Sequence, residues 1–145
     1  MERNRDGYTS PLSTRYASRE MQYLFSDNNK FRTWRKLWIA LAKAERQLGL
    51  HITQEQIQQL EAHADDVNYD VAEAREKLVR HDVMSHVYAY GQQCPDAEAI
   101  IHLGATSCYV GDNTDLLILR DASNLVLRKC AQVLRNLSAF AWQYK

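Results

Sequence analysis

The sequence predicts an all-α fold, because its long segments carry apolar residues at helical spacing and helix-breaking residues are scarce. Only two prolines and five glycines occur among the 145 residues. No segment has the alternating apolar and polar pattern of a half-buried strand. With 46% hydrophobic residues, a chain of this length can bury a core of its own. We therefore expect a globular helical protein.

The first strong helix is predicted from about Asp27 to Leu48, with Gly49 placed to end it. Residues 1–19, which precede it, have no helical period and are expected to form an extended arm. Two tryptophans on the apolar stripe of this helix indicate substantial burial. The stripe consists of Phe31, Trp34, Trp38, Leu41, Glu45 and Leu48.

A shorter helix is predicted after Thr53, which forms a plausible capping box with Gln56. Ile57 and Leu60 would face the core from this helix. Pro95 fits the first position of a brief helical turn further along the chain.

A third helix is predicted from a cap at Asp70 through Leu78 towards Tyr88, with Gly91 as its terminator.

The last helix is predicted from Thr114 to Lys145, which at 1.5 Å per residue gives a length of about 45 Å. This exceeds what a compact domain of this size needs, so the helix is expected to pack against further helices. The apolar pattern still runs at Tyr144 without a Gly, Asn or Pro stop, so the sequence is expected to end inside a helix. The apolar stripe consists of Leu116, Leu119, Val126, Cys130, Val133, Leu137, Phe140 and Tyr144.

The charge balance excludes partners that bind through bulk electrostatics. Basic and acidic residues both number 18, which argues against nucleic acid and against anionic membrane surfaces. No apolar run approaches the roughly 20 residues of a membrane span, and Met1–Gly7 is too polar for a secretory signal. We therefore expect a cytoplasmic protein. Cys94, Cys108 and Cys130 fit neither a disulfide framework nor a zinc site, and we expect reduced, partly buried thiols without an assigned role.

The stretch from Gly104 to Asn113 is the strongest candidate for contact with a ligand. Glycine allows the backbone to approach an anion closely, and the hydroxyls of Thr106 and Ser107 add hydrogen-bond donors. Asp112 or Asn113 can cap the next helix, whose positive dipole end would then favour a carboxylate or phosphate. An ordinary loop followed by a helix cap would have the same composition.

Arg80, His81 and Asp82 stand in a row within the predicted third helix. Consecutive residues cannot share one helix face, so one side chain points inward or the helix breaks there. A histidine beside an aspartate can be held in one tautomer, as acid–base chemistry or anion binding requires. A solvated face with a local salt bridge is the alternative. His86 is not at the i, i+4 spacing of a zinc pair, so no metal is expected.

Arg15 and Tyr16 in the N-terminal arm combine a bidentate phosphate donor with an aromatic hydroxyl, and they could hold a nucleotide phosphate. The same pair also occurs in ordinary loops. His102 is interpreted as a structural histidine, although it could contact a ligand.

Four blocks of the sequence resemble the adenylosuccinate lyase family of the animal type, within the fumarase/aspartase superfamily. The resemblance implies β-elimination of fumarate from adenylosuccinate to give AMP, and from succinylated aminoimidazole carboxamide ribotide in purine biosynthesis. It implies a purine nucleotide substrate, no metal or organic cofactor, and a homotetramer. The blocks are residues 10–18, 31–38, 80–86 and 101–115.

The same resemblance implies a domain plan: an extended arm at residues 1–19, the N-terminal helical domain at 20–111, and the start of a long central-bundle helix at 112–145. It also implies roles for individual residues, with His81 assisting catalysis by orienting or polarising the substrate. Arg15 and Tyr16 match residues that bind the nucleotide phosphate, Arg80, His81 and Asp82 match a substrate-binding trio, and Thr106 and Ser107 match the pair that holds the succinyl group.

The family's general-acid histidine and general-base serine have no counterpart in this sequence. We therefore expect a fragment that is inactive by itself. The alternative is a non-catalytic helical interaction module that associates with full-length lyase subunits through the apolar stripe of its last helix.

Overall fold

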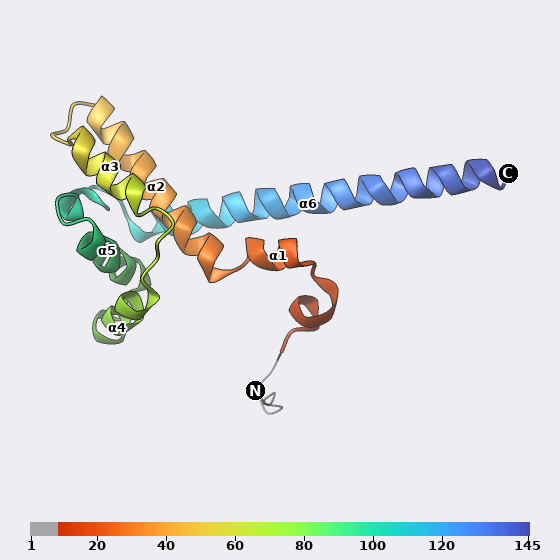
Figure 1. The fold of residues 1–145 in the computed structure, drawn as a ribbon, viewed down its shortest axis with the longest axis horizontal. Coiled ribbons are helices and arrows are strands. Elements are labelled where there is room, and N and C mark those ends of the chain that lie inside the picture. The colour runs from red at the N-terminus through yellow and green to blue at the C-terminus, as the bar shows by residue number, and fades with distance from the viewer. Residues whose placement is uncertain (1–8) are drawn as a thin grey trace. The chain divides into compact units, whose positions relative to one another are not determined.

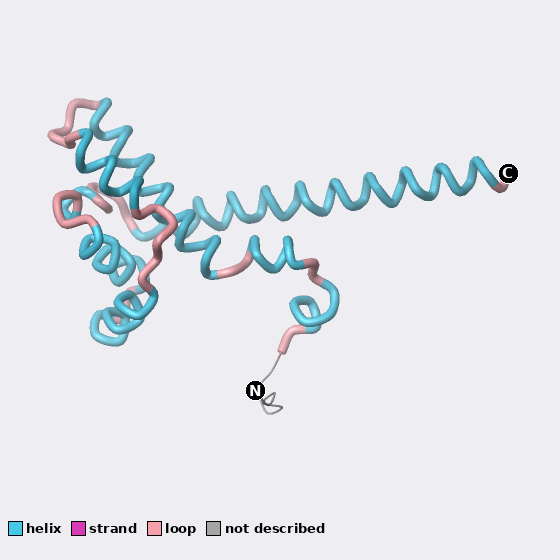
Figure 2. The backbone as a smooth tube through the Cα atoms, viewed as in Figure 1, coloured by secondary structure: helices cyan, strands magenta, loops and turns pink. Residues whose placement is uncertain are grey.

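The computed structural model describes residues 9–145, and every regular element in that range is helical (Figures 1 and 2). The predicted all-α fold is confirmed. Two compact units divide the chain: residues 27–116 form one, and the described residues up to Ser26 form the other together with residues 117–145. The elements are η1 (Leu12–Tyr16), α1 (Arg19–Leu24), α2 (Asp27–Gln47), α3 (Gln54–Ala62), α4 (Tyr69–Val79), α5 (Asp82–Gln93), η2 (Glu98–Ile100) and α6 (Ser107–Gln143).

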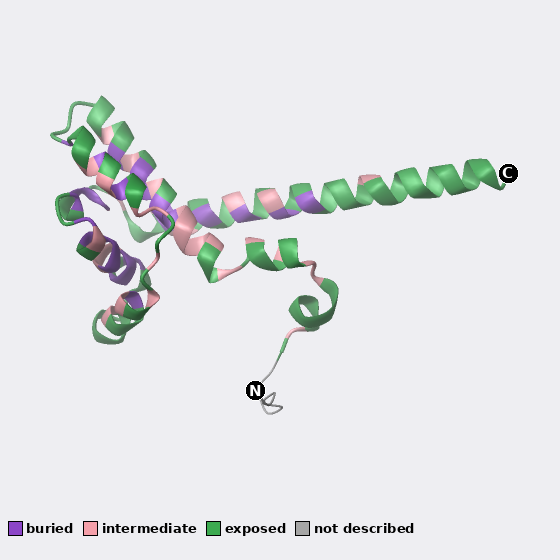
Figure 3. Ribbon diagram, in the orientation of Figure 1, coloured by how far each residue is buried: buried purple, intermediate pink, exposed green. Residues whose placement is uncertain are grey.

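The core of the unit formed by residues 27–116 is built on α2, and Figure 3 shows buried residues along this helix and on α5. Trp34 and Trp38 are each 1% exposed, so the burial predicted for the tryptophans is confirmed. Leu48 is 81% exposed, which contradicts its place on the predicted stripe. The reason is that α2 ends at Gln47 and the chain turns at Gly49, where φ is 93°.

The start of α3 has the predicted capping box. The Thr53 hydroxyl accepts the Gln56 N–H at 3.2 Å, and the Gln56 side chain accepts the Thr53 N–H at 2.9 Å. The cap predicted for the next helix was wrong. Asn68, rather than Asp70, caps α4 by accepting the Val71 N–H at 3.2 Å.

The predicted third helix is two helices, because the chain breaks at Arg80 and His81 between α4 and α5. Gly91 is also not a terminator, since α5 continues to Gln93. A Cβ at Gly91 would stand 2.7 Å from Cγ of Glu98, so this glycine allows the η2 segment to approach α5 closely.

The last helix begins at Ser107, seven residues before the predicted start at Thr114. Asp112 and Asn113 are therefore not caps but lie inside α6, where the Asn113 amide donates to the Tyr109 carbonyl at 2.7 Å. Val110 and Thr114 are fully buried one helical turn apart. Gly111 lies inside this part of α6. The burial of Val110 and Thr114 outweighs the roughly 1 kcal/mol that a glycine costs inside a helix.

The other unit contains α1 and residues 117–145, which include the C-terminal part of α6. Arg128 of α6 forms an ion pair with Glu20 of α1 at 3.1 Å. The arm predicted to be extended contains the π-helical turn η1, and its residues 1–8 lie outside the described residues. The apolar stripe predicted for the last helix is solvent-exposed over the C-terminal half of α6, for example at Leu137 and Phe140 (Figure 3).

None of the helices in residues 9–145 combines the length and the apolar character needed to cross a membrane.

His86 makes the core of residues 27–116 sensitive to acid. Its ring stacks on Phe31 with 3.7 Å between centroids, and meets Trp34 edge-on. Burial, and then the positive charge of Arg35, lowers the pKa of His86 to about 4 from an ordinary value of 6.5. As the pH is lowered below 6.5, His86 of the unfolded chain takes up a proton, whereas His86 of the folded chain does so only near pH 4. The free energy of unfolding therefore decreases as the pH is lowered from 6.5 to 4.

We expect the free energy of unfolding to drop by about 2 kcal/mol between pH 7 and pH 4.5 through His86 alone. Urea denaturation followed by tryptophan fluorescence at the two pH values measures this drop. The His86→Phe variant keeps an aromatic ring without a titrating group, so its drop should be smaller by that amount. An equal drop in both proteins would contradict the assignment.

Candidate functional site

The corner between α4 and α5 places Arg80, His81 and Asp82 at a break in the helix. The sequence allowed either such a break or an inward-pointing side chain, and the structure has the break. Arg80 has φ 51° and ends α4 in the left-handed region, with its N–H donating to the Glu76 carbonyl at 2.7 Å. A non-glycine residue in this region is uncommon and is found more often at functional sites than elsewhere. The side chains of all three residues are exposed.

The ring of His81 is held in one tautomer by the backbone of α5. Its Nδ1 accepts the Met84 N–H at 3.3 Å. The neutral imidazole therefore carries its proton on Nε2, which leaves an N–H donor on the other side of the ring. The sequence pointed to Asp82 as the group that fixes the tautomer, and this is wrong. The Asp82 carboxylate is 3.9 Å from Nδ1 and accepts the Val83 N–H at 2.8 Å instead.

His102 lies close enough to His81 for the two rings to interact electrostatically. Burial, and then the charge of His81, lowers the pKa of His102. The Trp38 indole N–H donates to Nδ1 of His102 at 3.0 Å, so His102 also presents its Nε2–H. The structural role predicted for His102 is therefore present at Nδ1, but the sequence did not indicate its place beside His81. The buried indole N–H of Trp38, which needs an acceptor, was the available signal.

The turn before α6 carries Thr106 and Ser107. The Ala105 N–H donates to the His102 carbonyl at 3.3 Å, and Gly104 has φ 63° within this turn. Thr106 and Ser107 are exposed, and Ser107 is the first residue of α6. The hydroxyl pair thus lies beside a helix N-terminus, as the sequence predicted. It is directly at that terminus, because α6 starts at Ser107 and not at the predicted Thr114.

Helix α2 holds this turn at both ends. Trp38 binds His102 at its start, and the Tyr109 O–H donates to the Leu37 carbonyl at 3.0 Å just beyond its end. Because α2 is the buried centre of the unit, the exposed hydroxyls are mounted on a rigid element, which favours precise recognition of a ligand.

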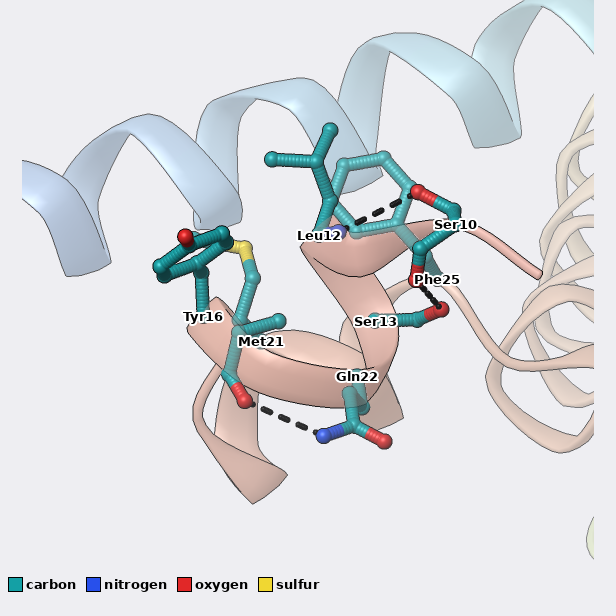
Figure 4. Close-up of a pocket in the computed structure, with 8 residues that line it drawn as sticks. Ser10, Leu12, Ser13, Tyr16, Met21, Gln22 and Phe25 are labelled. Atoms are coloured by element: carbon teal, nitrogen blue, oxygen red, sulfur yellow. Dashed lines mark hydrogen bonds between the residues drawn. The ribbon is translucent and has the colours of Figure 1, made fainter.

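Arg15 and Tyr16 belong to the other compact unit, where both are exposed on η1. The Arg15 guanidinium lies 5.4 Å from the centroid of the Tyr16 ring. Tyr16 lines a pocket of about 630 Å³ between η1 and α1, in which Figure 4 shows its ring beside the Met21 thioether. The grouping of this pair with Arg80, His81 and Asp82 stays a prediction. The pocket is lined by Ser10, Leu12, Ser13, Tyr16, Ala17, Met21, Gln22 and Phe25.

The known proteins that this chain resembles are lyases. No family model matches the chain. The adenylosuccinate lyase of Saccharomyces cerevisiae is 51% identical over 143 residues, 97% of this chain and 30% of that protein. The adenylosuccinate lyase of Schizosaccharomyces pombe is 50% identical over 141 residues, 95% of this chain and 29% of that protein. A more distant match, the N-acetyl-S-(2-succino)cysteine lyase of Enterococcus italicus, is 29% identical over 136 residues, 92% of this chain and 30% of that protein.

The chain belongs to the adenylosuccinate lyase family, as the resemblance of the four sequence blocks implied. It spans about 30% of the length of the curated relatives that it matches.

Proposed function

We propose that this chain supplies part of the active site of an adenylosuccinate lyase, which eliminates fumarate from adenylosuccinate to leave AMP. The same site would act on succinylated aminoimidazole carboxamide ribotide. The observation that carries the proposal is that His81 and His102 each have Nδ1 held by a hydrogen bond and present an Nε2–H, with His102 preceding the turn that exposes Thr106 and Ser107. Sequence identity of 51% to a named adenylosuccinate lyase supports it.

The chemistry of the elimination requires donors of this kind. Removal of a proton next to a carboxylate builds negative charge on that carboxylate, and hydrogen-bond donors aimed at it stabilise the transition state. Thr106 and Ser107 are suited to this task, because both are exposed at the start of α6, where the first amides of a helix have no intrahelical acceptor.

The names of the relatives support binding of a succinyl group by this family. Adenylosuccinate and the 2-succinocysteine compound share a succinyl unit and differ in what is attached to it. A segment that is similar in both enzymes is expected to bind the shared unit. Arg80, His81 and Asp82 would bind the adjoining part of the substrate, and Arg15 with Tyr16 the phosphate.

The chain alone would not turn over substrate. His81 would assist by donating its Nε2–H, while the general acid and the general base would come from segments outside this sequence. The family resemblance further suggests a cytoplasmic homotetramer without metal or organic cofactor.

A chimera tests the proposal. This chain would replace the matching segment of the Saccharomyces cerevisiae adenylosuccinate lyase, and fumarate release would be followed by ultraviolet absorbance. We expect activity within about tenfold of the parent enzyme. His81→Gln in the chimera should abolish most of it, whereas Glu73→Gln, on the exposed face of α4, should not. A folded chimera without activity would refute the proposal.

The second candidate function is a non-catalytic interaction module. The exposed apolar residues of α6, among them Val133, Leu137 and Phe140, favour it because a large exposed apolar patch commonly marks a contact surface. Size-exclusion chromatography with light scattering separates the candidates. A monodisperse monomer that does not associate with full-length lyase subunits would count against the module.

A further inference from the structure

Glu45 is a half-buried acid that the proposed chemistry does not use. It lies near the end of α2, and its Oε2 is buried without a hydrogen-bond partner among residues 9–145. Its Oε1 stands 3.9 Å from the position that a Cβ on Gly104 would take. The carboxyl group therefore packs against the turn that carries Thr106 and Ser107.

The surroundings of Glu45 disfavour its ionised form. An unpaired carboxylate loses hydration on burial, and burial accordingly raises the pKa of Glu45. The titratable group that faces it from α6 is Tyr109, whose own pKa is raised by burial and then by Glu45. The Tyr109 hydroxyl already donates to the Leu37 carbonyl, so it offers Glu45 no proton.

Donors for an ionised Glu45 exist on the turn itself. The first N–H groups of a helix have no intrahelical acceptor, and the dipole of α6 attracts negative charge to the same place. Gly104, with φ 63°, packs against Glu45 and precedes these amides in the chain, and a glycine can change conformation at little cost.

We propose that Glu45 is a proton-linked switch for residues 102–107. The neutral carboxyl group packs against Gly104, whereas the ionised group draws the N–H groups of the turn onto itself. The ionised form thereby competes with a substrate carboxylate for the donors beside Thr106 and Ser107. Only this competition with substrate rests on the proposed function. The movement of the turn is independent of it.

Nuclear magnetic resonance on the 145-residue chain tests the switch. The amide resonances of Gly104, Ala105 and Ser107 and the carboxyl carbon resonance of Glu45 are followed from pH 3.5 to 8. We expect all four to share one transition, with a midpoint above the 4.5 of an ordinary glutamate.

Two variants complete the test. Glu45→Gln should remove this transition from the turn amides, while Glu73→Gln, on α4, should leave it unchanged. The Trp38 indole N–H resonance reports that the fold is intact. The proposal is overturned if the turn amides do not follow the Glu45 carboxyl resonance in the unmodified chain, or if the same transition of the turn amides survives in folded Glu45→Gln. Neither outcome depends on lyase activity.

Discussion

Replacing Arg35 by methionine should lower the free energy of unfolding of residues 27–116 by about 3 kcal/mol. Arg35 is 2% exposed, and its Nη1 donates to the carbonyls of His63 and Asp66 while Nη2 donates to the Gln93 side chain at 2.7 Å. Its guanidinium also lies 4.2 Å above the Tyr90 ring. Methionine keeps the apolar stem but leaves the His63 carbonyl and the Gln93 side-chain oxygen without the Arg35 donor, while the Asp66 carbonyl keeps only the Gln93 amide as a donor. Each group that loses its partner on burial costs about 1 kcal/mol or more.

Arg32→Met is the matched control, because Arg32 lies one turn earlier on α2 and contacts the same loop. It donates to the Asp65 carbonyl at 3.2 Å and faces the Asp65 carboxylate at 3.7 Å, with 36% of its side chain exposed. An exposed contact of this kind contributes less than about 1 kcal/mol. Urea denaturation followed by circular dichroism measures both variants. Similar losses for the two would show that burial of Arg35 does not strengthen its contacts.

The features that the sequence predicted well are those set by local spacing. The stripe of α2 requires only that apolar residues recur every three or four positions, and the capping box at Thr53 closes within one turn. The burial of Trp34 and Trp38 and the existence of a long last helix follow from the same rule.

The features that it missed depend on contacts between distant residues. Arg80 adopts a left-handed conformation, which a sequence normally signals with a glycine. Without that glycine, the sequence could offer the break between α4 and α5 only as one of two possibilities, beside an unbroken helix with one side chain pointing inward. The early start of α6 depends on burial of Val110 in a core built mostly by α2, α3 and α5. Local composition favoured a loop there, and tertiary packing overrode it.

The candidate site shows the same division. The ionisable run at Arg80 and the hydroxyl pair at Thr106 were visible as residue types, because such groups are needed wherever an anion binds. The proximity of His102 to His81 could not be read from a separation of 21 residues. It arises because Trp38 fixes one ring and the α5 backbone fixes the other.

In the chimera described above, Ser107→Ala should lower kcat/KM for fumarate release by about 100-fold, the usual effect of losing one donor to a developing negative charge. Arg80→Ala should weaken the same step. Ser107 is exposed at the start of α6, so its loss removes little packing. The melting temperature should therefore change much less than in Trp34→Ala, which empties a buried site and costs about 3 kcal/mol or more.

Cys108→Ala is the matched control for Ser107→Ala, because Cys108 is the next residue of α6 and its thiol is also exposed. If the serine hydroxyl binds the succinyl group, kcat/KM falls in Ser107→Ala and stays near the parent value in Cys108→Ala. Steady-state kinetics and thermal denaturation of the same preparations separate binding from folding. If Ser107→Ala lost as much stability as Trp34→Ala, or matched Cys108→Ala in kcat/KM, the serine would have a structural role only.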